Sequence, residues 1–272
     1  MKLGIALFAL LWAFAFAAAT QQPARAEGLR IGGTGAVTAV LRALAPAVKA
    51  QTGIELSVVP NLGTTGAFSA LTDGKLALAV GGRPPRDIEK AMGLRVEGVL
   101  RTPFGFMTSR PGPDRLAKED IVRIHRAVDP RWPDGTPVLI ALRPVDESDN
   151  QIVADLFPGM ADALALLRKR RDLPIAATDQ DNADMAESTK GSLAGATVAQ
   201  IAAERRNLRF VSLDGVAPSL SAYLDGSYPY GKPLYLVVPT RPGADAMAFA
   251  RFVVSPAARP YLAALGLVAA AP

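Results

Sequence analysis

The sequence of 272 residues predicts an α/β protein built on a parallel sheet. Short apolar runs that end in glycine-rich turns indicate strands, and each turn is followed by a stretch whose apolar residues recur with helical spacing. This alternation is typical of a parallel sheet covered by helices. Half of the residues are hydrophobic and 20% are charged, which favours a packed core and excludes a disordered chain.

The stretch from residue 29 to residue 80 contains three predicted strands with helices between them. In chain order these elements are expected at residues 29–31, 37–48, 54–58, 68–71 and 76–80. Pro46 should kink or shorten the first helix, because proline lacks an N–H and clashes with the preceding turn. Gly53 is a suitable residue to end that helix.

The second half repeats the alternation. Strands are expected at residues 138–142, 208–213 and 234–238, and helices up to 156 and at 160–167, 247–254 and 256–265. Thr178 or Asp179 is expected to cap a further helix, because short polar side chains accept hydrogen bonds from the first free N–H groups. His125 lies in a helical pattern among charged residues, so we expect it on a solvated face.

The composition excludes several kinds of site. With no cysteine, the chain has no disulfide, no cysteine-ligated metal and no cysteine nucleophile. A single histidine argues against a Ser-His-Asp hydrolase, and the acid-rich stretch 178–187 does not match a calcium loop. The formal charge of +5 is not gathered into a basic block, which argues against a nucleic-acid partner. We therefore expect no enzyme activity, no metal and no cofactor.

The N-terminus has the features of a secretory signal peptide. Met1-Lys2 precedes an uncharged apolar run at 3–19, and Ala24-Arg25-Ala26 fits the small-residue rule for cleavage. We expect cleavage after Ala26 and a soluble periplasmic protein. The alternative is an uncleaved membrane anchor, although the run is at the short limit for spanning a bilayer.

Two loops at predicted strand ends offer groups that bind anions. Gly33-Thr34-Gly35 and Gly63-Thr64-Thr65-Gly66 each open a helix, where free backbone N–H groups and the positive end of the helix dipole face outward. Glycine allows close approach and threonine adds a hydroxyl. Two such loops facing each other would hold a small oxyanion. The alternative for each loop is ordinary helix capping.

Four segments together resemble the family of periplasmic phosphate-binding proteins of ABC importers. They are Gly33-Thr34-Gly35-Ala36-Val37, Gly63-Thr64-Thr65-Gly66-Ala67, Val80-Gly81-Gly82-Arg83-Pro84 and, late in the chain, Asp225-Gly226-Ser227-Tyr228-Pro229 with Lys232-Pro233-Leu234-Tyr235. The resemblance also includes the turn Trp132-Pro133-Asp134-Gly135 and the run Asp214-Gly215-Val216-Ala217-Pro218. It therefore covers nearly the whole mature chain.

This resemblance implies a fold of two α/β lobes of the type II periplasmic-binding-protein superfamily, which close on a ligand in the cleft. Each lobe would hold a mostly parallel sheet. After the signal peptide 1–26, the first lobe would take residues 27–102 and return for 211–272, and the second would take 103–210. It further implies an inorganic phosphate or similar oxyanion as ligand, an ABC permease in the inner membrane as partner, and a monomer.

The expected ligand contacts come from both lobes. They are Thr34, Gly35, Ala36, Thr64, Thr65, Gly66, Arg83, Arg143 and Ser148. The two arginines suit an oxyanion because a guanidinium donates two parallel, charge-assisted hydrogen bonds. The alternative for either arginine is a surface ion pair, for instance of Arg83 with Asp87.

The sequence departs from the family at two places that bear on selectivity. The run Arg143 to Asn150 keeps Arg143 and Ser148 but not the Ser-Gly-Thr of the family, and Gly82-Arg83 stands where a Ser-Asp or Ser-Arg pair is common. An Asp there accepts the proton of hydrogen phosphate. Asp146, Glu147 or Asp149 could replace it, or these acids could cap helices.

Two other functions remain open at this stage. A binding module of the same fold could sense a different anionic ligand and signal to a membrane partner. A phosphoesterase is disfavoured, because the sequence offers no metal cluster and no Ser-His base pair.

Overall fold

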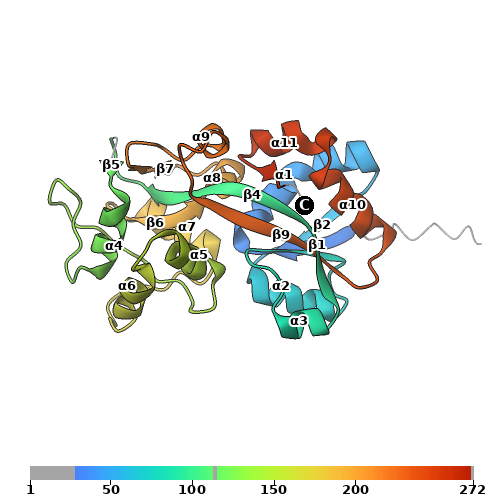
Figure 1. The fold of residues 1–272 in the computed structure, drawn as a ribbon, viewed down its shortest axis with the longest axis horizontal. Coiled ribbons are helices and arrows are strands. Elements are labelled where there is room, and N and C mark those ends of the chain that lie inside the picture. Colours follow the sequence, from blue (N-terminus) through green and yellow to red (C-terminus); the bar gives the residue numbers. More distant parts are fainter. Residues whose placement is uncertain (1–27, 113–114, 271–272) are drawn as a thin grey trace, which may run out of the picture.

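The computed structural model describes residues 28–112 and 115–270, so the predicted signal peptide lies outside the described residues. The predicted α/β class is confirmed: strands form a twisted central ribbon and helices cover it on several sides (Figure 1). Among the described residues, no helix is both long and apolar enough to cross a membrane.

The main sheet is mixed. Its strands run in the order β10 (Val268–Ala269), β4 (Leu94–Thr108), β9 (Gly231–Pro239), β3 (Leu78–Gly81), β1 (Leu29–Gly33) and β2 (Leu56–Val59). β1 pairs in parallel with β2 and β3, as predicted. β9, however, is antiparallel to both β3 and β4, so only the first three strands keep the predicted parallel order.

Helices and short strands complete the chain. The helices are α1 (Gly35–Thr52), α2 (Gly63–Thr72), α3 (Asp87–Ala91), α4 (Lys118–Arg126), α5 (Ser148–Leu156), α6 (Met160–Leu167), α7 (Asp179–Ser188), α8 (Val198–Glu204), α9 (Leu220–Leu224), α10 (Ala244–Val254), the 3-10 turn η1 (Pro256–Ala258) and α11 (Arg259–Ala264). Two further strands of the main sheet, β6 (Ala194–Thr197) and β7 (Arg209–Phe210), pair antiparallel with β4, contrary to the mostly parallel sheet predicted for the second lobe. The strands β5 (Arg115–Leu116) and β8 (Ser212–Leu213) pair in parallel with each other.

Pro46 does not shorten α1, so this part of the prediction is wrong. The helix continues to Thr52 and ends at Gly53, which adopts the left-handed conformation with φ of 74°. Pro46 and Arg42, whose carbonyl loses its helical donor to the proline, both lie on the exposed side. Water can therefore solvate that carbonyl, which reduces the penalty of an internal proline.

The predicted strand at 138–142 does not form a continuous ladder. It makes only single parallel bridges, from Leu139 to Ser192 and from Leu142 to Ile175. At Leu139 its backbone hydrogen-bonds to one neighbouring segment, and at Leu142 it hydrogen-bonds to another. The second pairing cannot be extended at Pro174, because proline has no N–H. The segment is buried as predicted at Val138, Ile140 and Leu142, but it is extended chain and not a regular strand.

His125 is buried, so the prediction of a solvated face is wrong. Its ring lies edge-on to Phe106 with centroids 5.9 Å apart, and Nδ1 lies 2.7 Å from the Ile121 carbonyl oxygen. Burial lowers the pKa of His125 below its usual 6.5, although the bond to Ile121 acts in the other direction. The histidine therefore belongs to the core, where the neutral ring packs among apolar residues.

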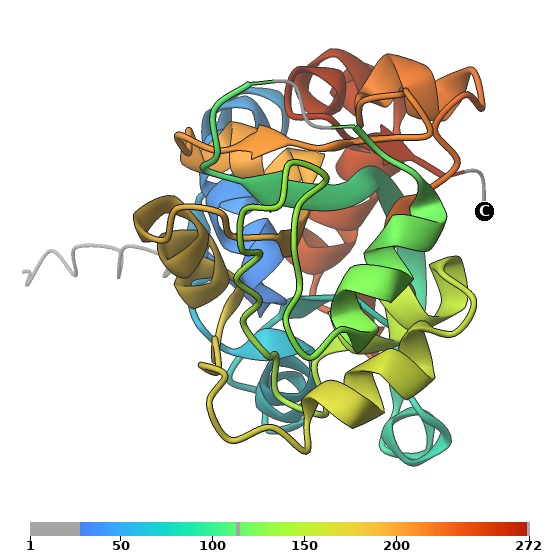
Figure 2. The ribbon, with the colours of Figure 1, turned by 90° about the vertical axis from the view of Figure 1, so that its left-hand side faces the viewer.

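The buried residues form two large cores. One, including Ile31, Leu44 and Phe249, lies between α1, α10 and the sheet; the other, including Ile124 and Phe157, lies under α4, α5 and α6. We call the parts around these cores the first and the second lobe. Figure 1 shows β4 and β9 passing from one lobe to the other, and Figure 2 views the second lobe end-on, with α4 and α6 towards the viewer.

The lobe boundaries stay predictions, and the packing favours one adjustment. Val211, Leu213 and Tyr228 lie in the core of the second lobe, and the Tyr228 hydroxyl donates a 3.0 Å hydrogen bond to the Phe104 carbonyl. We therefore place the return to the first lobe at β9, which begins at Gly231, instead of near residue 211.

Candidate functional site

The candidate site is a cavity of about 300 Å³ between the lobes. The first lobe contributes the start of α1 and the loop and first turn of α2, which follow β1 and β2. The second lobe contributes the segments before α5 and α7. Five of the predicted contacts line the cavity: Gly35, Thr64, Thr65, Gly66 and Ser148. The sheet places both helix N-termini at the same edge, as expected for parallel strands.

The N-terminus of α1 already binds a carboxylate of the protein itself. Asp179 Oδ2 accepts a 2.6 Å hydrogen bond from the Ala36 N–H and a 3.3 Å bond from the Thr34 hydroxyl. Asp179 is the first residue of α7, and its side chain is only 4% exposed. The N–H and hydroxyl groups of this loop therefore hold a carboxylate of the second lobe, while their contact with a solute anion stays a prediction.

Arg143 is the third partner of the Asp179 carboxylate. Its Nη2 lies 2.8 Å from Asp179 Oδ1 and 3.4 Å from Glu147 Oε2, and its Nη1 donates to the Thr178 carbonyl. The guanidinium is buried, and its Nε has no hydrogen-bond partner. Arg143 therefore pairs with Asp179 at the α1 N-terminus, and its contact with a solute anion stays a prediction.

Glu147 and Ser148 form the start of α5. Glu147 Oε1 accepts hydrogen bonds from the Ser148 N–H at 2.9 Å and from the Ser148 hydroxyl at 3.0 Å, so Glu147 caps the helix. Burial raises the pKa of Glu147, and the neighbouring carboxylates of Asp179 and Asp149 raise it further. Glu147 therefore takes up a proton at a higher pH than an ordinary glutamate.

Lys232 on β9 is fully buried beside the cavity and pairs with Asp149. Desolvation lowers the pKa of Lys232, but the carboxylates of Asp149, Asp179 and Glu147 outweigh it and give a net raised pKa. The backbone of Gly82 lies close to side chains of both lobes at this place. A Cβ on Gly82 would lie 2.3 Å from the Ser148 hydroxyl and 3.2 Å from Lys232 Cε, so only glycine fits.

The start of α2 is tied to the end of β3. Thr64 Oγ1 accepts a 2.9 Å hydrogen bond from the Gly82 N–H, and Thr65 Oγ1 accepts a 3.3 Å bond from Arg83. Arg83 makes a two-point ion pair with Glu89 at 2.7 and 2.8 Å, and its guanidinium lies over the Phe68 ring. Arg83 does not line the cavity, and its ligand contact stays a prediction.

The charge of the cavity lining is negative. Asp146, Glu147 and Asp179 line it, and none of the lysines or arginines in the described part of the chain does. Within residues 28–112 and 115–270, no group of three His, Cys, Asp or Glu side chains is placed to hold a metal ion. Arg143 and Lys232 carry positive charges, but neither lines the cavity, and both are paired with acids.

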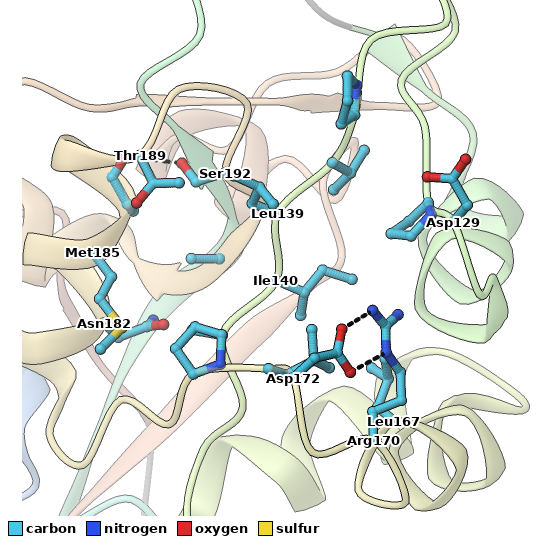
Figure 3. Close-up of a pocket in the computed structure, with 18 of the residues that line it drawn as sticks. Asp129, Leu139, Ile140, Leu167, Arg170, Asp172, Asn182, Met185, Thr189 and Ser192 are labelled. Carbon is cyan, nitrogen blue, oxygen red and sulfur yellow. Dashed lines mark hydrogen bonds and ion pairs between the residues drawn. The ribbon is translucent and has the colours of Figure 1, made fainter.

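A second cavity, of about 390 Å³, lies inside the second lobe (Figure 3). Leu139, Ile140, Leu167 and Met185 give it a largely apolar wall, and the ion pair of Arg170 with Asp172 lies at one side. It contains none of the predicted contacts, and an apolar wall does not suit a small oxyanion. The interlobe cavity is therefore the candidate site.

Two site residues, Asp179 and Lys232, were missed from the sequence. Asp179 was expected only as a helix cap, a task that the structure gives to Thr178, whose hydroxyl accepts a 3.0 Å bond from the Asp181 N–H. Lys232 was noted only as a residue of the late motif. Its partner Asp149 was one of three acids considered either to read the proton of the ligand or to cap a helix. One available signal was a lysine within an apolar strand, since a buried lysine requires a paired acid.

Comparisons with known proteins give the family and the fold. The family model described as a PBP superfamily domain matches residues 17–257. The structure is similar to that of a putative phosphate ABC transporter substrate-binding protein with bound phosphate from Clostridium perfringens, at 16% identity and a TM-score of 0.73 over 89% of this chain and 99% of that chain. No curated protein matches the sequence.

Two further structures are similar at the level of the fold. One is the periplasmic molybdate-binding protein of Azotobacter vinelandii, at 14% identity and a TM-score of 0.58 over 90% of this chain and 99% of that one. The other is the CcmR regulatory domain of Synechocystis in complex with 2-PG, at 15% identity and a TM-score of 0.53 over 83% and 94%. The predicted two-lobed binding-protein fold is confirmed.

Proposed function

Because the chain belongs to the PBP superfamily, we propose that it is an exported solute-binding protein that captures phosphate or a related small oxyanion between its lobes. It would deliver this solute from the periplasm to an ABC permease in the inner membrane, as a monomer and without catalysing a reaction. One observation carries the proposal: the α1 N-terminus and Arg143 together bind a carboxylate, which has the charge and oxygen geometry of a small oxyanion.

The donors around the cavity suit such a solute. The Ala36 N–H and the Thr34 hydroxyl point at the subsite, and Thr64, Thr65 and Ser148 bring further hydroxyls to the wall. A helix N-terminus stabilises negative charge within its first turn. Two of the similar structures, from Clostridium and Azotobacter, are named for phosphate and molybdate, which supports the same class of ligand.

A thermal-shift panel on residues 27–272, purified free of phosphate, tests the proposal. Phosphate, arsenate, sulfate and molybdate would be compared, with isothermal titration of any anion that stabilises the protein. Saturation at about 100 times Kd should add about 2.7 kcal/mol of stability, or roughly 5–11 °C for a chain of this size. Arg143→Ala should abolish the shift, while Arg123→Ala, an exposed arginine paired with Asp120, should retain it.

The outcomes separate the alternatives. A shift with phosphate and arsenate but not sulfate would indicate that a carboxylate reads the proton of the ligand. A shift with sulfate or molybdate would indicate that the Gly82-Arg83 departure has changed selectivity. No shift with any of the four anions would contradict the oxyanion proposal.

A second candidate function is ligand sensing for a membrane or regulatory partner. The likeness to the CcmR regulatory domain favours it, because the same fold serves there in a regulatory protein. Pull-down of the solute-loaded protein with its native membranes would distinguish the two. An ABC permease among the bound proteins supports transport, and a sensor kinase supports signalling.

A further inference from the structure

We infer that Asp179 is an internal ligand: its carboxylate fills the anion subsite at the α1 N-terminus and holds the two lobes together when no solute is bound. The inference rests on the proposed function, because the same donors would bind the solute oxyanion. A solute must therefore displace Asp179, which makes this residue a determinant of affinity and selectivity.

The geometry shows that Asp179 uses the donors of both lobes at once. Oδ2 bonds the Ala36 N–H and the Thr34 hydroxyl of the first lobe, and Oδ1 bonds Arg143 of the second. These three donors satisfy the two oxygens from opposite sides. A phosphate oxygen at the same N–H group would occupy the position of Oδ2, so the two anions exclude each other.

The backbone around Asp179 is fitted to this contact. A Cβ on Gly35 would lie 2.7 Å from Asp179 Oδ2 and 2.9 Å from Gln180 Oε1, so glycine is required for α7 to come this close. Gln180 Nε2 donates a 3.0 Å bond to the Gly35 carbonyl, and Gln200 Nε2 donates a 3.1 Å bond to the Asp179 carbonyl. The carboxylate is thus positioned by neighbours on both sides.

The charges explain why the contact closes the lobes. A buried carboxylate is strongly unfavourable unless it is paired and hydrogen-bonded, and Asp179 obtains the amide and hydroxyl only when α7 meets α1. Opening the cleft would separate it from the first lobe. A solute dianion beside Asp179 would be repelled, so the anion gains its donors only as Asp179 leaves them.

Interlobe distances measured without solute test this directly. The chain has no cysteine, so Ile88→Cys on α3 and Leu166→Cys on α6 give two unique spin-label sites, 69% and 48% exposed, in different lobes (Figure 1). In phosphate-free buffer we expect a short, narrow distance distribution for the otherwise wild-type protein. Asp179→Ala should give a longer and broader one.

Two further variants serve as controls. Asp184→Ala removes an acid of the same helix that pairs with Arg206 and is 64% exposed, so it should leave the distances unchanged. Asp179→Asn keeps the size of the side chain and removes its charge, so it tests the charge even if the alanine variant folds poorly. We expect its distance distribution to lie between those of wild type and Asp179→Ala.

Titration with inorganic phosphate gives a second readout. If Asp179 competes for the subsite, Asp179→Ala should bind phosphate at least about tenfold more tightly than wild type. An unchanged distance distribution in both Asp179 variants, or weaker phosphate binding in Asp179→Ala, would overturn the inference. If Asp179→Ala opens but neither protein binds phosphate, the internal ligand is supported and phosphate as the solute is contradicted.

Discussion

At the scale of single residues, the site contains acidic and basic side chains that are buried in contact with one another. Lys232 and Asp149 pair directly, and both lie below 10% exposure. Such a pair contributes little net stability compared with apolar residues, because both charges lose their hydration. Removing only one partner is far more damaging, because it leaves the other charge buried alone.

The Lys232 pair gives a prediction for stability. Lys232→Met leaves Asp149 without its partner and is expected to lower the free energy of unfolding by about 3–5 kcal/mol. Adding Asp149→Asn should restore part of this loss, by about 1–3 kcal/mol, because the uncompensated charge is gone. Urea unfolding of wild type and the two variants measures both changes, and a double variant less stable than Lys232→Met would contradict the pairing.

Glu147 gives a prediction for the pH dependence of binding. Its raised pKa means that it takes up a proton at a higher pH than an ordinary glutamate. At alkaline pH its charge opposes a bound anion, and this repulsion disappears as the pH falls through the raised pKa. Glu147→Gln should therefore bind phosphate more tightly than wild type at alkaline pH, and the difference should shrink as the pH falls through the raised pKa of Glu147.

Isothermal titration of both proteins at each pH measures this difference. The comparison cancels the titration of phosphate itself, which is the same for both proteins. The glutamine oxygen can still accept the Ser148 N–H, so the start of α5 is retained. A constant ratio of affinities across the range would show that Glu147 does not interact with the bound anion.

At the scale of elements, the contact of α7 with α1 depends on a glycine in the first turn of α1. Gly35→Ala would place a methyl group 2.7 Å from Asp179 Oδ2. We expect it to displace Asp179 and to lower the free energy of unfolding by about 1–3 kcal/mol, as in other overpacked sites. The spin-label distance should lengthen as it does for Asp179→Ala.

Gly66→Ala is the matched control for this prediction. Gly66 lies in α2 and lines the same cavity, but its added Cβ would meet only Leu62 Cβ at 3.8 Å, an ordinary contact. Because alanine is the better helix former, stability should stay equal or rise by up to about 1 kcal/mol. If both variants open the lobes equally, the glycine at 35 has no special role.

At the scale of the whole molecule, two cores joined by β4 and β9 place one cavity between them. The sequence predicted the first-lobe side of this cavity well, because a strand, a glycine-threonine turn and a helix start are local patterns. α1 begins at Gly35, as expected from its turn, whereas α2 begins at Gly63, inside the run that was expected to be a loop before a helix at 68–71. The second lobe was harder, because residues 138–142 pair by isolated bridges that no local period reveals.

The central contact could not be predicted from the sequence for a physical reason. Asp179 and Ala36 are separated by 143 residues, and a helix-start acid has the same local signature whether it caps its own helix or reaches another. Only the packing of the lobes decides between them. The same holds for Lys232, whose partner Asp149 lies 83 residues away.

The most direct test of the account follows the Ala36 amide in a ¹⁵N-labelled sample while phosphate is added. If the oxyanion binds at this N–H, Ala36 and the first residues of α7 should show the largest changes, as the solute arrives and Asp179 leaves. Binding of phosphate that moves resonances elsewhere but leaves Ala36 and Asp179 unchanged would contradict the proposed site.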